Sequence, residues 1–167
     1  MSTAKGQMDT DGKPIKSDFV GTTLTSIPEL LGGWMGGVKD EEGNACEQDK
    51  PCGPGNLRYV ESIRTLFIGE DTSRRNNNYV WAFNIDTRKL SRILSVPMAA
   101  EATGLMIAPD YNGHAYIMSN FQHPGETGSK DPDWATVSQL LNANWNNRLK
   151  TAIGYIGTVD GALPAMK

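Results

Sequence analysis

The sequence of 167 residues lacks any unbroken apolar run long enough to cross a membrane. A membrane-spanning helix needs about 20 consecutive apolar residues, so we expect no membrane span. Residues 1–16 are polar and lack the apolar stretch that forms the core of a secretory signal peptide. We therefore expect no signal peptide within this chain.

An excess of basic residues is also missing. The sequence has 16 Lys and Arg residues against 19 Asp and Glu residues, which gives a formal net charge of -3. Proteins that bind nucleic acids need a concentrated basic surface to contact the phosphates. This charge balance argues against a nucleic-acid partner.

Cysteine is scarce, with only two in the chain. Cys46 and Cys52 lie close together in a loop rich in glycine, proline and acidic residues. This spacing suits a small disulfide in an oxidising compartment, and free thiols are the main alternative. A zinc site is the weakest interpretation, because such sites use about four ligands and this loop offers no histidine.

The chain is long enough for one folded core. Residues 1–56 form a loop-rich N-terminal segment with many glycines and prolines. Within it we predict a short helix near residues 27–31, with Ser26 as the N-cap and Pro28 in the first turn. Residues 57–167 carry the strand patterns, and we expect them to form one structural unit with the first segment.

Short strand patterns separated by turn signals fill most of the remaining chain. Alternating apolar residues and an Asn-Gly turn at 112–113 predict two hairpins and a preceding strand pair. A helical pattern at 134–145 is followed by one last strand. The expected strands are 57–60, 65–69, 79–85, 90–96, 105–108, 114–119 and 151–159.

This order of elements predicts an all-β fold with one short C-terminal helix. Four successive antiparallel strands followed by a hairpin and another strand are typical of about two blades of a β-propeller. A propeller closes a ring of roughly four to eight blades. We therefore expect the chain to associate with the missing blades or with copies of itself.

Carboxylates follow two of these strand patterns. Glu70 and Asp71 end the apolar run 66–68, and Glu101 stands alone among alanine, threonine and glycine. Carboxylate oxygens suit a hard cation such as calcium. The alternative is that these acids are ordinary solvated residues at strand ends, as most acidic residues are.

Polar residues near these acids have similar alternatives. Arg74 and Arg75 could bind a substrate phosphate through their guanidinium groups, although a solvated turn is favoured. Residues 76–78, all asparagine, could offer amide oxygens to calcium, but a turn is again favoured. His123 is the better of the two histidines for a role in a site, and a structural hydrogen bond is the favoured alternative.

Five motifs in this chain occur in the same order in a known family. They are Gly-Asn-Leu-Arg-Tyr at 55–59, Leu-Phe-Ile-Gly-Glu-Asp-Thr-Ser at 66–73, Asn-Asn-Asn-Tyr-Val-Trp-Ala-Phe-Asn at 76–84, Ala-Glu-Ala-Thr-Gly at 100–104 and Ile-Met-Ser-Asn-Phe-Gln-His-Pro at 117–124. Together they closely resemble the C-terminal part of PhoX-type alkaline phosphatases. The resemblance covers nearly the whole chain but only a minor part of the family's full length.

This resemblance implies a fold, an activity and a location. PhoX-type enzymes are β-propellers that hydrolyse phosphate monoesters at a site holding calcium and iron, and they act in the periplasm or outside the cell. By resemblance, Glu70 and Glu101 are metal ligands, and Asp71 either binds metal or orients Glu70. Arg74 is a candidate contact for the substrate phosphate.

The family's cysteine ligand and several other ligands belong to its earlier blades and have no counterpart in this sequence. The chain therefore holds only part of the family's metal cage. The expected function is that of the C-terminal portion of a metal-dependent phosphatase. The alternative is a non-catalytic binding or self-assembly fragment derived from a propeller.

Overall fold

The computed structural model describes residues 2–126, 133–144 and 151–166. The chain divides into two compact units, residues 1–31 and 32–167. In the first unit, β1 (Ser2–Ala4) pairs with β2 (Val20–Thr23), and neither strand was predicted. The predicted short helix is present as a 3-10 helix, η1 (Pro28–Leu30), and Ile27 rather than Ser26 occupies its N-cap position.

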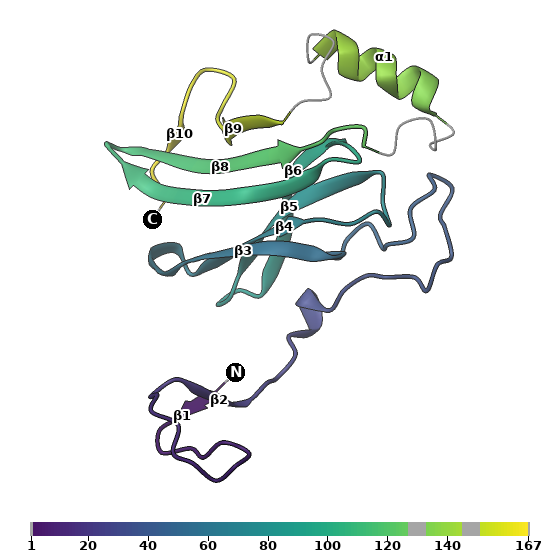
Figure 1. Ribbon diagram of the computed structural model, residues 1–167. Helices are drawn as coiled ribbons and strands as arrows, with labels where there is room; N and C mark the ends of the chain where they lie inside the picture. Colours follow the sequence, from purple (N-terminus) through teal and green to yellow (C-terminus); the bar gives the residue numbers. More distant parts are fainter. Residues whose placement is uncertain (1, 127–132, 145–150, 167) are drawn as a thin grey trace. The chain divides into compact units, whose positions relative to one another are not determined.

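The first sheet of the second unit is a four-stranded antiparallel meander in the order β3-β4-β5-β6 (Figure 1). The predicted strand pair and the predicted hairpin that follows it are both confirmed, and β4 pairs with β5 to join them. A short 3-10 helix, η2 (Glu61–Ile63), connects the first two strands. The strands are β3 (Pro54–Val60), β4 (Thr65–Glu70), β5 (Asn77–Asn84) and β6 (Lys89–Met98).

The second sheet is built on a long hairpin of β7 (Glu101–Tyr111) and β8 (His114–Gln122). Asn112 and Gly113 have φ angles of 55° and 83°, as the tight turn predicted for Asn-Gly requires. The predicted last strand is β9 (Ala152–Ile156), and it pairs with β8. A two-residue strand, β10 (Leu163–Pro164), also pairs with β8 and is too short to leave a sequence pattern.

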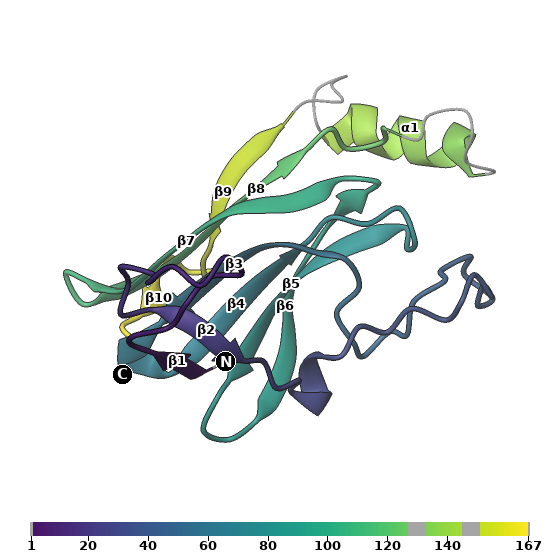
Figure 2. The same cartoon turned by 60° about the horizontal axis from the view of Figure 1, so that its bottom comes forward.

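The two sheets lie face to face, with β7 and β8 stacked over the β3-β6 sheet (Figures 1 and 2). One buried cluster between them joins Val60 and Phe67 of the first sheet to Ile107 and Ile117 of the second. A second cluster contains Val80, Val96, Ala100 and Ala102. Burial of alternate residues on the facing sides of both sheets supplies the hydrophobic stabilisation of the core.

The predicted helix is α1 (Trp134–Asn144), and residue 145 lies outside the described residues. Leu141 is its buried residue. Gly125 packs against the helix so closely that an added Cβ would lie 2.7 Å from the Leu141 side chain and 2.9 Å from the Trp134 ring. Within the described residues, no helix is both long and apolar enough to cross a membrane.

The expected all-β class with antiparallel sheets and one α-helix is therefore confirmed. The described strands form open sheets and do not close a propeller ring. Each of the two stacked sheets has four strands. Membership in a propeller remains a prediction.

Near the predicted acids Glu70 and Glu101, strands β4 and β7 of the two sheets approach each other closely. The Nδ2 group of Asn56 donates to the carbonyl oxygen of Ala102 at 3.0 Å. A Cβ on Gly69 would collide with this same carbonyl oxygen and come within 2.9 Å of the Asn56 amide. Only glycine fits at this crossing without displacement of the backbone.

We therefore expect Gly69→Ala to lower the free energy of unfolding by about 1–3 kcal/mol, because the added methyl group must push the strands apart. Gly154→Ala is the matched control, since a Cβ on Gly154 in β9 meets nothing within 4 Å. Urea denaturation of both variants measures the difference. Equal losses of stability in the two variants would contradict this account of the crossing.

Candidate functional site

A polar pocket of about 270 Å³ lies at one end of the first sheet. It is formed by the loop before the disulfide, the turn after β4, the β6–β7 connection and the turn after β8. Segments far apart in the sequence thus contribute to one cavity. The lining residues are Lys39, Gly43, Asp71, Thr72, Ser73, Arg75, Asn76, Asn78, Met98, Ala99, Glu101, His123 and Glu126.

Two of the three predicted metal ligands, Asp71 and Glu101, line this pocket, and Glu70 does not belong to the lining. The Oε2 atom of Glu101 lies 3.7 Å from Nε2 of His123. On its other side, Nδ1 of His123 lies 3.2 Å from Oε2 of Glu126. The histidine therefore stands between two carboxylates, and protonation of its ring would let it pair with both.

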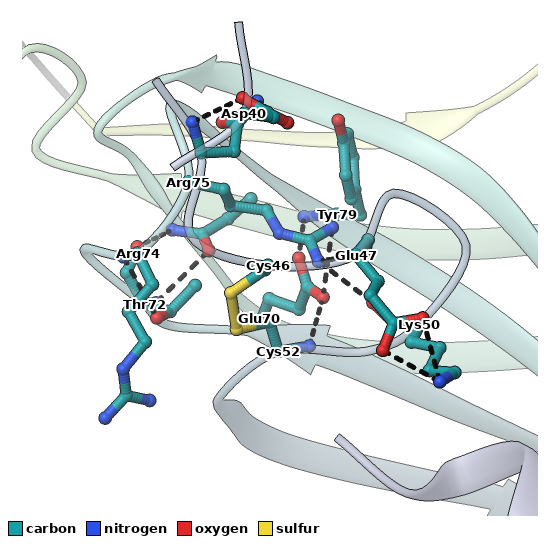
Figure 3. Close-up of a disulfide and its surroundings, with 12 residues drawn as sticks. Asp40, Cys46, Glu47, Lys50, Cys52, Glu70, Thr72, Arg74, Arg75 and Tyr79 are labelled. Atoms are coloured by element: carbon teal, nitrogen blue, oxygen red, sulfur yellow. Dashed lines mark hydrogen bonds and ion pairs between the residues drawn. A yellow bond between two sulfur atoms is a disulfide. The ribbon is translucent and has the colours of Figure 1, made fainter. Parts of the chain in front are cut away.

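Glu70 ends β4, and its carboxylate is completely buried. Its Oε1 atom accepts a hydrogen bond from the backbone N–H of Cys52 at 2.7 Å (Figure 3). The same atom accepts a second hydrogen bond from the indole N–H of Trp81 at 2.8 Å. Its Oε2 atom accepts a hydrogen bond from the backbone N–H of Tyr79 at 2.9 Å. These three donors join the end of β4 to the disulfide loop and to β5.

Arg75 provides the positive charge beside Glu70, with Nη1 lying 3.6 Å from Oε1. The Arg75 side chain is only 2% exposed, so this is a buried ion pair. Burial raises the pKa of Glu70, and the opposing effects of the Arg75 charge and the three N–H donors are smaller. Arg75 and the three N–H donors thus hold the carboxylate in place, while its removal from water costs free energy.

The guanidinium group of Arg75 is also fixed by the disulfide loop (Figure 3). Its Nη2 atom donates to the carbonyl oxygens of Glu47 at 3.0 Å and Lys50 at 2.9 Å. The guanidinium group also lies over the ring of Tyr79, with 4.9 Å between the guanidinium carbon and the ring centroid. The expected solvated turn is therefore wrong for Arg75, because carbonyl groups from a distant loop replace its water.

Arg74, the candidate phosphate contact, is exposed and outside the pocket lining. Its guanidinium carbon lies 5.1 Å from the ring centroid of Trp34. The expected exposed position is confirmed for this arginine. Its observed partner is an aromatic ring.

Cys46 and Cys52 form a disulfide, as the sequence favoured (Figure 3). Both residues are 1% exposed. The loop that they close supplies the N–H group bound by Glu70 and the carbonyl groups bound by Arg75. The disulfide therefore fixes the irregular segment that surrounds the buried ion pair.

Asn78 connects the two acid-bearing segments of the pocket. Its amide oxygen accepts a hydrogen bond from the N–H of Thr72 at 3.1 Å, and Nδ2 donates to the carbonyl oxygens of Thr72 at 3.2 Å and Ala100 at 2.8 Å. Thr72 follows Asp71, and Ala100 precedes Glu101. Asn78 lies in β5 rather than in the favoured turn, and its amide oxygen is occupied by the chain itself.

The fit of these residues to a calcium and iron site is partial. Both oxygens of Glu70 already accept N–H hydrogen bonds, so Glu70 does not fit the role of a ligand in this conformation. Asp71 and Glu101 lie at the pocket, where carboxylates could contact a cation. Among the described residues, however, no group of three or more histidine, cysteine or acidic side chains could hold a metal ion.

Comparison with models of protein families, with curated proteins and with solved structures finds no match to this chain. The functional interpretation therefore depends on the five ordered motifs and on the geometry of the pocket. Sequence reasoning found two of the three acids that line the pocket, Asp71 and Glu101, and did not single out Glu126. It missed the buried position of Arg75, since the sequence around it offers no apolar pattern.

We expect Glu70→Ala to lower the free energy of unfolding by about 3–5 kcal/mol, because it leaves a buried arginine charge and three N–H donors without an acceptor. Asp71→Ala is the matched control, since Asp71 is the neighbouring acid and is exposed. Its effect should stay within about 0.5 kcal/mol. Urea denaturation followed by circular dichroism compares the two, and a small loss for Glu70→Ala would exclude the structural role.

The raised pKa of Glu70 also predicts how stability depends on pH. The folded state binds the Glu70 proton more tightly than the unfolded chain, whose ordinary value is 4.5. The stability contributed by this proton is fully present below that value and is lost as pH rises through the folded-state pKa. The side chain of the Glu70→Gln variant cannot titrate in this way. Its free energy of unfolding, measured by denaturation between the unfolded-state and folded-state pKa of Glu70, should therefore lack this part of the pH dependence.

Proposed function

We propose that this chain is the C-terminal portion of a PhoX-type alkaline phosphatase, a metal-dependent hydrolase of phosphate monoesters. In this proposal its two stacked sheets are late blades of a β-propeller. The consecutive strand order β3-β4-β5-β6 and the sheet that follows it support this assignment. The five motifs, in the family's order, support it independently.

The observation that carries the proposal is that Asp71 and Glu101 line one polar pocket. They come from two different motifs, one at the end of β4 and one at the start of β7. Polar contacts of Asn78 bring these two segments together. An arrangement that gathers separated acids at one cavity is what a cation site requires.

Within this site, Asp71 and Glu101 are the proposed ligands for calcium and iron. Such cations neutralise the phosphate oxygens of a bound ester. Glu70 fixes the end of β4 that carries Asp71, because its own oxygens are occupied by N–H groups. Since the described residues hold only part of a cage, the other ligands come from further blades.

The proposed location is the periplasm or the outside of the cell. The Cys46–Cys52 disulfide supports this location, because disulfides form and persist in oxidising compartments. This support is independent of the acidic pocket.

The second candidate function is that of a non-catalytic, propeller-derived binding or self-assembly module. The observation that favours it is the lack of a complete metal-binding group among residues 2–126, 133–144 and 151–166.

Hydrolysis of p-nitrophenyl phosphate by the protein that carries this sequence, supplied with calcium and iron, separates the two candidates. We expect Glu101→Gln to reduce turnover and bound metal by about 10–100-fold, as loss of a group at a metal site does. Glu61→Gln is the control, since Glu61 is an exposed acid outside the pocket lining.

The metal content of each variant is measured alongside its turnover. Full activity and full metal content in Glu101→Gln would exclude the proposed role of Glu101. A wild-type protein that binds both metals without hydrolysing the ester would favour the non-catalytic module.

A further inference from the structure

A second cavity, of about 670 Å³, lies between β6, the end of β8 and helix α1. Residues 94–98 of β6 and Phe121 of β8 contribute to its lining. The helix contributes Val137, Leu140 and Leu141, and the spacing of three and four residues places these side chains on one helical face. We call this cavity the apolar groove.

The helix that lines the groove is fixed to the end of β6 through the turn after β8. The backbone N–H of Gly125 donates to the carbonyl oxygen of Met98 at 2.7 Å. Gly125 itself packs so closely against the side chains of Leu141 and Trp134 that an added Cβ would collide with both. The groove is therefore formed by elements whose separation is set by these contacts.

The apolar groove and the polar pocket are neighbours. Asn76 and Met98 line both cavities. The turn after β8 lies at the same junction, since His123 and Glu126 line the polar pocket and Gly125 binds Met98. A single ligand can therefore extend from the carboxylates of the polar pocket into the groove.

The polar groups of the groove favour an apolar ligand part. Of the described residues that line it, only Asp133 is charged, and a negative charge repels a phosphate group. Asn76, Asn77 and Asn144 each donate from Nδ2 to a backbone carbonyl oxygen of the chain at 2.9 Å. The hydroxyl groups of a sugar would therefore lose hydrogen bonds to water and find few replacements.

Size and side-chain type define the class of ligand further. Small-molecule sites have volumes of about 300–1,000 Å³ and mostly apolar linings with a few polar groups, and the groove matches both descriptions. Phe121 and Met98 offer an aromatic ring and a thioether, which both pack favourably against a ring. Leu140 is 58% exposed, so its side chain is available for contact with a ligand.

We propose that the apolar groove binds the alcohol portion of a phosphate monoester whose alcohol is apolar and carries a ring. The phosphate group of the same molecule lies in the polar pocket, beside the proposed cation ligands Asp71 and Glu101. The substrate class assigned in this way rests on the proposed phosphatase function of the polar pocket. Leu140 and its neighbours determine specificity and take no part in bond cleavage.

Binding of phenethyl alcohol to the metal-free protein tests the groove apart from catalysis. In protein labelled at the methionine methyl groups, we expect the NMR signal of Met98 to shift as phenethyl alcohol is added. Met106 is the internal control, because it is 58% exposed and lies outside both linings. No shift at Met98, or equal shifts at both methionines, overturns the proposal.

Leu140→Asp places a charge in the groove, and Gln139→Asp is the matched control, one position away on the same helix and outside the lining. We expect Leu140→Asp to weaken binding of phenethyl alcohol by about tenfold or more, as loss of apolar contacts in a substrate pocket does. Gln139→Asp should leave this binding unchanged. Circular dichroism establishes that both variants are folded, and Leu140→Ser repeats the test without a charge.

Turnover of two esters in the presence of calcium and iron tests the substrate class. Phenethyl phosphate and glycerol phosphate both release a primary alcohol, so their leaving groups are chemically similar. We expect kcat/KM to be higher for phenethyl phosphate by about tenfold or more, and Leu140→Asp to remove most of this ratio. Equal values for the two esters, or a ratio that Leu140→Asp does not change, overturn the proposal while the phosphatase assignment stands.

Failure of the proposed function gives a different result. Binding of phenethyl alcohol at Met98 without hydrolysis of either ester overturns the phosphatase assignment, and the substrate class with it. In a longer natural protein that carries this sequence, a Met98 signal that does not respond to phenethyl alcohol also overturns the proposal, because another part of the polypeptide then covers the groove.

Discussion

The buried contact between Glu70 and Arg75 is the interaction on which the rest of the second unit depends. It places a carboxylate and a guanidinium group where water cannot reach them, and every compensating hydrogen bond comes from another segment of the chain. Residues of the irregular disulfide loop thus become part of the sheet's hydrogen-bonding network. Removal of one partner would leave the other buried and uncompensated, so the loop and the sheet are stabilised together.

This contact also determines where the pocket acids lie. Asp71 follows the fixed residue Glu70 directly, and Asn78 connects the next residue, Thr72, to the segment that carries Glu101. The acids at the cavity are exposed or partly exposed, while the residues that position them are buried. A division of this kind lets exposed groups contact a ligand without loss of the fold that orients them.

Local patterns were sufficient to predict most of the strands. Alternation around Trp81 and the Asn-Gly pair at 112–113 each indicate a structure within a few residues, and both hairpins are present. The disulfide was also favoured correctly, because its two cysteines are near neighbours. Arg75 was misjudged, because its carbonyl partners lie more than 20 residues away in a loop without regular structure. The same reason explains why the donors bound to Glu70 could not be foreseen, and the propeller and its metals stay predictions.

Trp81 has a consequence for how this protein can be observed. Its indole is 3% exposed and donates to Glu70, whereas Trp34 is 59% exposed. The two side chains therefore experience different polarity, and an indole in a dry environment emits at shorter wavelength than one in water. The emission of Trp81, once separated from that of the three other tryptophans of the chain, therefore reports on the environment of the buried carboxylate without any attached dye.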